Sequence, residues 1–205
     1  LGMRIKRGKK YHKYVNFFRV VYKFHAPYKV LLDGNFFHHF CKEHVDIKFQ
    51  LNKILQDQPF TFMTKCIMRE LENLGEDKLG RDTLKQARLT VKLPCGHSGG
   101  ILDPDECIEA YIGKRNENKV FVATNDEDLR NKLRNNGSVP IFFYNRTGVL
   151  VMDSPSDVSA QKFKMREQLK LEPTKAEKIF LKGQQDAIME LEREQKEEEK
   201  LRERQ

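Results

Sequence analysis

Four short apolar runs alternate with segments of helical spacing, and this alternation is the feature that most narrows the folds open to the chain. The runs cover residues 28–32, 60–63, 120–123 and 141–144. Between them, apolar residues recur at helical spacing over residues 36–56, 65–74, 81–89 and 126–136. Thr64 can cap the second of these helices and Gly75 can end it. Because strands that alternate with helices are joined by right-handed crossovers, we predict an α/β domain with a mostly parallel central sheet flanked by helices.

The excess positive charge of the chain lies in its first 26 residues. Residues 1–26 contain eight Lys and Arg and no acid, whereas residues 27–153 hold 18 basic and 18 acidic residues. The remaining residues, 154–205, balance 12 against 12. We therefore predict a basic arm (1–26), one folded domain (27–153) and a tail (154–205) that is helical or partly extended. The residue pattern at 184–205 is typical of a single exposed helix that docks on a partner.

The basic arm is interleaved with aromatic residues, a composition that suits RNA. Cations neutralise phosphates and release counterions, and aromatic rings can stack on unpaired bases. Nuclear targeting or an ordinary solvated terminus are the alternatives. The predicted RNA-binding residues are Arg4, Lys6, Arg7, Lys9, Lys10, Lys13, Arg19 and Lys23, with Tyr11, Tyr14, Phe17, Phe18 and Tyr22 between them.

The sequence gives no sign of a membrane span or of secretion. It has no run of about 18 apolar residues, and the N-terminal segment has no apolar region of the kind found in signal peptides. We therefore expect an intracellular protein without a membrane partner. In a reducing compartment the four cysteines are expected to be thiols or metal ligands, not disulfides.

Four acids lie close to predicted transitions from strand to helix: Asp33, Glu70, Asp105 and Asp126. In a parallel sheet these residues can meet at one edge, where a divalent cation such as Mg²⁺ or Mn²⁺ would offset their repulsion and could position water for attack on a phosphate. Asp128 is a fifth candidate. Acids also favour first helical turns for purely structural reasons. That alternative best explains Asp103 and Glu106, and it stays open for Asp105, Asp126 and Asp128.

Three cysteines and one histidine could form a zinc site. Cys66, Cys95, His97 and Cys107 supply three thiolates and an imidazole, although their spacing does not follow a standard finger pattern. The alternative is that Cys66 and Cys107 are small buried hydrophobic residues and that the Pro-Cys-Gly-His turn is unrelated to them. A second possible cluster consists of Cys41, His38, His39 and His44, but its sequence is also that of a helix with mixed faces.

Five segments together resemble PIN-domain rRNA-processing proteins of the small-subunit processome. They are VLLDGNF (30–36), TKCIMRELENLG (64–75), LPCGHSGG with DECI (93–108), VFVATNDEDLRNKLR (120–134) and SVPIFFYNRTGVLVMD (138–153). The short basic N-terminus, KFHAPYKVLLDG and the MDSPS continuation are most similar to the Utp twenty-three family, whose sister is the Fcf one family. The resemblance covers about residues 3–165.

The resemblance implies a PIN fold, a structural zinc ion on Cys66, Cys95, His97 and Cys107, and work on pre-rRNA and an H/ACA snoRNA in the nucleus and nucleolus. It also implies a non-catalytic scaffold whose tail contacts other processome proteins. However, Asp33, Glu70, Asp105 and Asp126 all occupy the acid positions of active PIN nucleases. A Mg²⁺- or Mn²⁺-dependent endoribonuclease that cleaves single-stranded RNA is therefore the alternative function.

Overall fold

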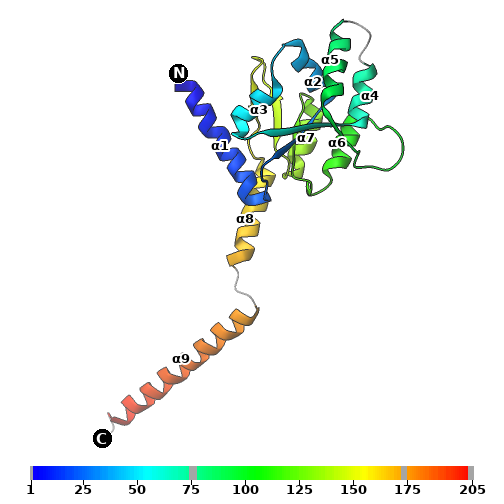
Figure 1. The fold of residues 1–205 in the computed structure, drawn as a ribbon. Helices are drawn as coiled ribbons and strands as arrows, with labels where there is room; N and C mark the ends of the chain where they lie inside the picture. The colour runs from blue at the N-terminus through cyan, green and yellow to red at the C-terminus, as the bar shows by residue number, and fades with distance from the viewer. Residues whose placement is uncertain (1, 74–77, 172–174, 203–205) are drawn as a thin grey trace. The chain divides into compact units, whose positions relative to one another are not determined.

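The computed structural model describes residues 2–73, 78–171 and 175–202, and within them six strands form one sheet in the order β3-β2-β1-β4-β5-β6 (Figure 1). Every neighbouring pair is parallel except β5 and β6, so the predicted mostly parallel sheet is confirmed. The strands are β1 (Tyr28–Leu32), β2 (Pro59–Thr64), β3 (Val91–Leu93), β4 (Val120–Ala123), β5 (Ile141–Tyr144) and β6 (Leu150–Met152).

The centre of the sheet is the centre of the core. Leu31 in β1 pairs with Phe62 in β2 on one side and with Val122 in β4 on the other, and all three side chains are fully buried. Helices cover both faces, as an apolar parallel sheet requires (Figure 1). The chain runs outward from β1 to β2 and β3, then returns to β4 on the other side of β1. Sheets of this kind carry their sites at the carboxyl ends of the strands where the order reverses, here β1 and β4.

The predicted helices are confirmed with shifted ends. The segment 36–56 is broken at His44, whose φ of 50° is left-handed, so that two helices replace one. The helix predicted at 81–89 begins earlier, and the stop predicted at Gly75 lies outside the described residues. The helices are α1 (Gly2–Tyr22), α2 (Gly34–Lys42), α3 (Ile47–Leu55), α4 (Lys65–Asn73), α5 (Lys78–Leu89), α6 (Pro104–Ile112), α7 (Glu127–Asn136), α8 (Asp157–Leu171) and α9 (Lys175–Arg202).

The basic N-terminal segment is a helix that packs on the domain, beside α3 (Figure 1). Val15, Phe18 and Phe24 belong to the hydrophobic core, and the four remaining aromatic residues of α1 are partly buried against it. The prediction that these rings are available to stack on bases is therefore wrong for Phe18, which is 2% exposed, and the other rings are also packed on protein. The reason is helical spacing, since Tyr11, Val15, Phe18 and Tyr22 recur along one side of the helix and that side packs on the core.

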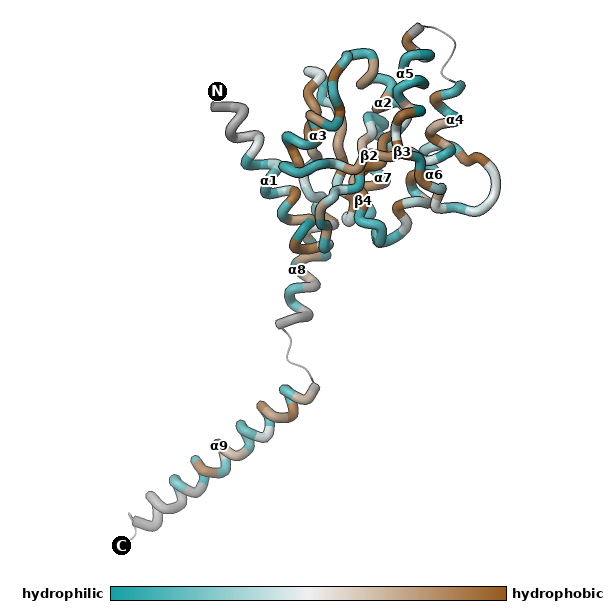
Figure 2. The backbone as a smooth tube through the Cα atoms, in the orientation of Figure 1, coloured by the Kyte–Doolittle hydropathy of each residue, from teal (hydrophilic) through white to brown (hydrophobic). Residues whose placement is uncertain are grey.

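The chain divides into two units, residues 1–162 and residues 163–205. The second unit is helical where it is described, which confirms the predicted C-terminal helix. Its residues are largely hydrophilic, with short groups of apolar residues along α9 (Figure 2). Among the described helices, none is both long and apolar enough to cross a membrane. The exposed large apolar side chains of α9 are Ile179, Phe180, Leu181, Ile188, Met189 and Leu191.

Candidate functional site

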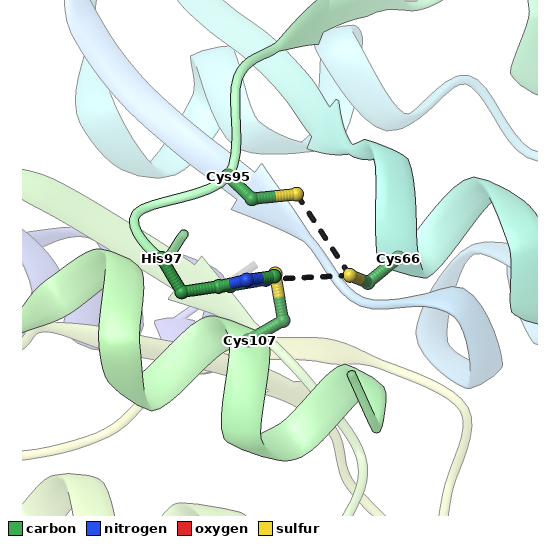
Figure 3. A group of neighbouring side chains, drawn as sticks. All are labelled: Cys66, Cys95, His97 and Cys107. Atoms are coloured by element: carbon green, nitrogen blue, oxygen red, sulfur yellow. Dashed lines mark hydrogen bonds between the residues drawn. The ribbon is translucent and has the colours of Figure 1, made fainter. Parts of the chain in front are cut away.

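Three elements bring the predicted thiol ligands together, forming what we call the Cys/His group: Cys66, Cys95, His97 and Cys107 (Figure 3). Cys66 lies in the first turn of α4, Cys95 and His97 in the loop after β3, and Cys107 in the first half of α6. Their ligand atoms all lie within 4.8 Å of one another. Within the described part of the chain, this is the one set of three or more such residues close enough to hold a metal ion.

Two separations within the Cys/His group match those of a zinc tetrahedron. The Cys66 Sγ lies 3.8 Å from the Cys95 Sγ and 3.4 Å from the His97 Nε2. A tetrahedral zinc ion with Zn–S near 2.3 Å and Zn–N near 2.0–2.1 Å needs separations of about 3.8 Å between sulfurs and about 3.5 Å between sulfur and nitrogen. The donor set and its geometry therefore fit zinc.

The surroundings of the Cys/His group favour a thiolate at Cys95, where hydrogen bonds within the group outweigh burial and lower the pKa of the thiol. The Leu102 N–H donates to the Cys66 Sγ at 3.4 Å, and the Cys107 thiol donates to the Thr64 hydroxyl at 3.3 Å. Thr64, predicted as a helix cap, thus lies at the end of β2 and faces the sulfur ligands. Burial raises the pKa of Cys107 to about 12, so this thiol stays protonated unless a cation lies beside it. Such a site binds its metal with release of a proton.

A glycine fixes the loop that carries Cys95 and His97. A Cβ atom at Gly96 would lie 2.5 Å from the Tyr111 Cα in α6, so only glycine allows the loop to approach the helix this closely. The His97 Nδ1 is buried without a hydrogen-bond partner, while Nε2 faces Cys66. The ring is thus presented to the sulfurs through Nε2, the nitrogen that a metal would use.

The second possible cluster does not form a ligand set. Cys41 is buried and donates to the Gln86 side chain at 3.5 Å, and the His38 Nδ1 pairs with the Thr83 hydroxyl at 3.2 Å. These contacts join α2 to α5. Among the residues that the structure describes, Cys41, His38, His39 and His44 are not grouped closely enough for a metal ion, so the structural interpretation of this segment holds.

The four predicted acids lie around the carboxyl ends of the strands, and we call them the acid rim: Asp33, Glu70, Asp105 and Asp126. Asp33 follows β1 directly and is the N-cap residue of α2, and Asp126 occupies the same place at α7 after β4. Glu70 lies in α4 and Asp105 in the first turn of α6. Electrostatic coupling links Asp33 to Asp105 and Asp126, and Glu70 to Asp33 and Asp105. Asp33 and Asp126 thus follow adjacent parallel strands, and each rim acid is electrostatically coupled to at least one other.

Asp33 is the most enclosed member of the acid rim, with 2% of its surface exposed. Burial raises the pKa of its carboxyl to about 6, and the charges of Asp105 and Asp126 add to that effect. A hydrogen bond of 2.7 Å from the Thr124 hydroxyl to Oδ2 acts in the opposite direction. The same Thr124 oxygen accepts the Asp126 N–H at 3.0 Å, so one buried hydroxyl joins two acids of the rim.

Glu70 is half-buried and lies against the start of α2. Its burial raises the pKa of the carboxyl to about 7, with Asp33 as the next largest cause. The Oε2 atom is buried without a hydrogen-bond partner, whereas Oε1 accepts from the Asn35 side chain at 3.5 Å. An orphaned carboxylate oxygen in a cluster of acids is a position where a cation could bind. A Cβ atom at Gly34 would overlap Oε2, so this glycine makes the space for it.

Asp105 and Asp126 are more open than Asp33. Burial and the charge of Asp126 raise the pKa of Asp105, while Lys132 lowers it. One Asp126 oxygen accepts the Leu129 N–H at 2.7 Å, so this residue caps α7 as well as lying on the rim. Asp128 is exposed, and its charge acts on Lys132. Asp103 is the N-cap of α6 and accepts the Asp105 N–H at 3.0 Å, which confirms its structural role.

Sequence reasoning missed Gly34, Asn35 and Thr124 as parts of the rim. Each lies beside a predicted acid, in the Asp-Gly-Asn turn after β1 or the Thr-Asn-Asp segment after β4. A small residue or a hydroxyl next to an acid at a strand end is the sequence feature that could have identified them.

The contacts of the Cys/His group and the acid rim do not test the predicted RNA-binding residues. Side chains of Arg4, Lys6 and Arg7 lie outside the described residues, and exposed cations are present on or directly after α1 at Lys9, Lys10, Lys13, Arg19 and Lys23.

Comparison with known proteins confirms the resemblance. The family model Fcf1 matches residues 53–154. The rRNA-processing protein utp23 of Schizosaccharomyces pombe is 29% identical over 191 residues, which cover 92% of this chain and 72% of that protein. The human rRNA-processing protein FCF1 homolog is 28% identical over 149 residues, 72% of each chain.

A solved structure confirms the fold. The structure of the PIN domain endonuclease Utp24 superimposes with a TM-score of 0.55 at 28% identity, and the match covers 64% of this chain and 96% of that one. The mostly parallel sheet and flanking helices described above are thus those of a PIN domain. The chain is therefore a homologue of the rRNA-processing proteins Utp23 and Fcf1, and it carries an Fcf1-family segment within a PIN fold.

Proposed function

We propose that this protein is a nucleolar ribosome-biogenesis factor of the small-subunit processome that binds pre-rRNA, an H/ACA snoRNA or both. Its homology to rRNA-processing proteins supports a role in rRNA processing, and a PIN fold supports contact with RNA. The tail, residues 163–205, would contact other processome proteins through the exposed apolar side chains of α9. The observation that carries RNA binding is the anchored basic helix α1.

The anchoring of α1 matters because it turns a charged segment into a fixed surface. The apolar face of the helix is in the core, so its cations are held on the opposite face. A rigid row of cations meets phosphates with less loss of conformational freedom than a mobile arm would. Lys9 and Lys13 are exposed on this face, Lys10 is exposed beside it with its Nζ 5.6 Å from the centre of the Tyr14 ring, and residues 1–26 contain no acid to neutralise them.

Surface substitutions test this proposal better than deletion of residues 3–25, which would remove Val15, Phe18 and Phe24 from the core. We expect replacement of Lys9, Lys10 and Lys13 by alanine to weaken binding of single-stranded RNA about tenfold or more. The slope of log affinity against log salt should fall by about 2, at roughly 0.7 per phosphate contact. The control is an equal loss of charge on α2, α3 and α5, at Lys42, Lys48 and Lys85. A purely protein-binding module would show no salt-sensitive RNA affinity in any variant.

We propose that the Cys/His group holds a structural zinc ion. Bound there, zinc would tie the start of α4, the loop after β3 and α6 to one point. Its geometric fit supports this assignment, as does the pKa of Cys95, which hydrogen bonds within the group lower in spite of burial. Because Glu70 lies in α4 and Asp105 in α6, the same ion would also fix two elements that carry rim acids.

A metal-dependent endoribonuclease is the second candidate, and the acid rim is the observation that favours it. A Mg²⁺ or Mn²⁺ ion, when bound, supplies a Lewis acid that activates water and neutralises phosphate charge. The acid rim would hold this ion. Asp33 and Glu70 would bind it through their carboxylate oxygens on the buried side of the rim, and Asp105 and Asp126 would do so on the more exposed side. Thr124 would keep Asp33 and Asp126 in place. Utp24, whose structure is similar, is a PIN domain endonuclease, and that activity agrees with the chemistry proposed for the acid rim.

Incubation of the purified protein with single-stranded RNA and Mn²⁺ separates the two candidates. Cleavage by the wild type that is lost in Asp33→Asn, but kept in the surface control Asp82→Asn, would establish the endoribonuclease. If RNA is bound but stays intact with all three proteins, the domain is a scaffold. The Asn substitution keeps an oxygen that can accept the Thr124 hydroxyl, so it removes charge with little change of shape.

A further inference from the structure

A pocket of about 520 Å³ opens at the amino edge of the sheet, at the other end of the strands from the acid rim. Tyr28, the first residue of β1, is part of its lining, and the neighbouring strand β2 starts just after Asp57, which also lines it. One wall is formed by α1 and the segment that follows it. The opposite wall is formed by the end of α3. We call this cavity the α1 pocket.

Both walls of the α1 pocket are fixed by left-handed residues at helix ends. Lys23 ends α1 with a φ of 61°, and Gln56 ends α3 with a φ of 56°. The Phe24 N–H closes the first turn on the Phe18 carbonyl at 3.3 Å, and the Gln56 N–H closes the second on the Asn52 carbonyl at 2.7 Å. Phe24 then enters the core against Phe121. The pocket is therefore a built part of the domain and not a gap beside a loose helix.

The α1 pocket faces its ligand with unpaired positive charge. Arg19 and Lys23 line it, are exposed, and form no salt bridge within the described part of the chain. The single acid among the lining residues is Asp57, and one of its oxygens already accepts the Gln58 N–H at 2.7 Å. Two free cations on one wall of a concave site attract an anion.

The rest of the lining suits a nucleoside better than a bare phosphate. Its apolar side chains include Val15, Val20, Phe24, Ala26 and Leu55, and polar groups on Asn16, Gln56, His12 and His25 lie among them. A lining that combines apolar side chains with many polar groups suits a ligand that has both a ring system and a charged group. An inorganic phosphate would use the cations and leave this surface uncovered.

We propose that the α1 pocket holds one unpaired nucleotide of a single-stranded RNA. This inference rests on the proposed RNA-binding function and gives it a location. The phosphate pairs with Arg19 and Lys23, and the base lies against Val15, Val20 and Leu55 with Asn16, Gln56 or Asp57 as hydrogen-bond partners. Because the pocket lies at the amino edge and the acids at the carboxyl edge, RNA retention and any chemistry at the rim are separable.

The first test measures the affinity of a fluorescein-labelled 12-nucleotide single-stranded RNA as a function of salt. We expect Arg19→Glu with Lys23→Glu to weaken binding at least tenfold and to reduce the salt slope by about 1.4, two contacts at roughly 0.7 each. The control, Lys42→Glu with Lys48→Glu, changes the charge equally on α2 and α3 and should weaken binding less than threefold. Equal losses of RNA affinity in both variants, or no loss in either, would overturn the proposal that the α1 pocket binds a nucleotide.

The second test uses adenosine 5′-monophosphate, which can enter the pocket but cannot span a surface. We expect it to shift the ring resonances of His12 and His25, which line the pocket, and Val20→Tyr should abolish the shift by filling the space without a change of charge. No shift in the wild type would overturn the pocket while leaving RNA binding by the lysines of α1 intact. A shift without any affinity for the 12-nucleotide RNA would keep the pocket and contradict the proposed function. Thermal melts check that each variant is folded, because Arg19 also complements the dipole of α1.

Discussion

The Cys/His group and the acid rim lie close together on α4 and α6, yet the chain holds them in different ways. The four ligand atoms of the Cys/His group lie within 4.8 Å of one another, whereas among the described residues no three rim acids are drawn together to that degree. The difference follows from charge. Thiols and an imidazole can pack closely without a cation, but carboxylates at the same spacing would repel. The Cys/His group can therefore assemble before a metal binds. The rim acids, in contrast, are only brought near one another by the helices and strand ends that carry them.

Two glycines show the same contrast. At Gly96 an added Cβ would meet the backbone of Tyr111, which cannot move without moving α6. At Gly34 it would meet the end of the Glu70 side chain, which can swing away. The loop of the Cys/His group is therefore fixed by backbone contact, while at the rim the neighbour of the glycine is the end of a side chain that can adopt another rotamer.

The largest effect is expected from loss of a Cys/His ligand. Cys107→Ser should reduce bound zinc, measured by elemental analysis, from about one ion per chain to near zero. We expect several kcal/mol of stability to be lost with the ion, since metal binding free energy contributes directly to folding. Cys41→Ser is the control, because Cys41 is also buried but lies apart from the group. Equal zinc content in the two variants would contradict the assignment.

Alanine substitutions at Gly96 and Gly34 should show which of the two sites can adjust to an added methyl group. Gly96→Ala is expected to destabilise the protein by about 1–3 kcal/mol, the usual cost of overpacking, and to weaken zinc retention. Gly100→Ala in the same loop meets no atom within 4 Å and should change stability little. Gly34→Ala should cost less than Gly96→Ala in urea unfolding but displace Glu70. If Gly34→Ala proves the more damaging of the pair, the rim is as rigid as the Cys/His group.

The last prediction concerns pH. The folded chain binds a proton on Asp33 more tightly than the unfolded chain does, because burial raises the pKa from 3.8 to about 6. Stability is therefore lost as pH rises between about 4 and 6, since the folded state binds more protons over that range. Asp33→Asn should be more stable than the wild type at pH 7.5, by about 1–3 kcal/mol, and the gain should disappear near pH 4. Urea unfolding at the two pH values measures it; a variant that is less stable at pH 7.5 would contradict the account.

Much of this architecture could be predicted from the sequence. The four apolar runs became β1, β2, β4 and β5, because a strand buried on both faces leaves a continuous apolar signal. The strands β3 and β6 were not predicted, since three residues each give too short a pattern. The placement of α1 was also missed. Its cations suggested a free arm, although the spacing of Tyr11, Val15, Phe18 and Tyr22 is that of a helix face.

The candidate sites, like the fold, could be predicted only in part from the sequence. The rim acids were predictable because parallel strands bring their carboxyl ends to one edge, which makes residues such as Asp33 and Asp126 neighbours in space. Contacts across the edge were not predictable. The hydroxyl of Thr124 joins two acids only because β4 lies beside β1, and the overlap between Gly34 and Glu70 depends on how α2 approaches α4.

The central claim is that one edge of this domain carries two metal sites of different kinds. Anomalous diffraction from crystals of the full chain soaked in MnCl₂, recorded at the zinc and manganese edges, tests it most directly. The account predicts a zinc peak among Cys66, Cys95, His97 and Cys107 without added zinc, and a separate manganese peak bounded by Asp33, Glu70 and Asp105. A Cys/His group without zinc, or a rim that takes up no manganese, would contradict it.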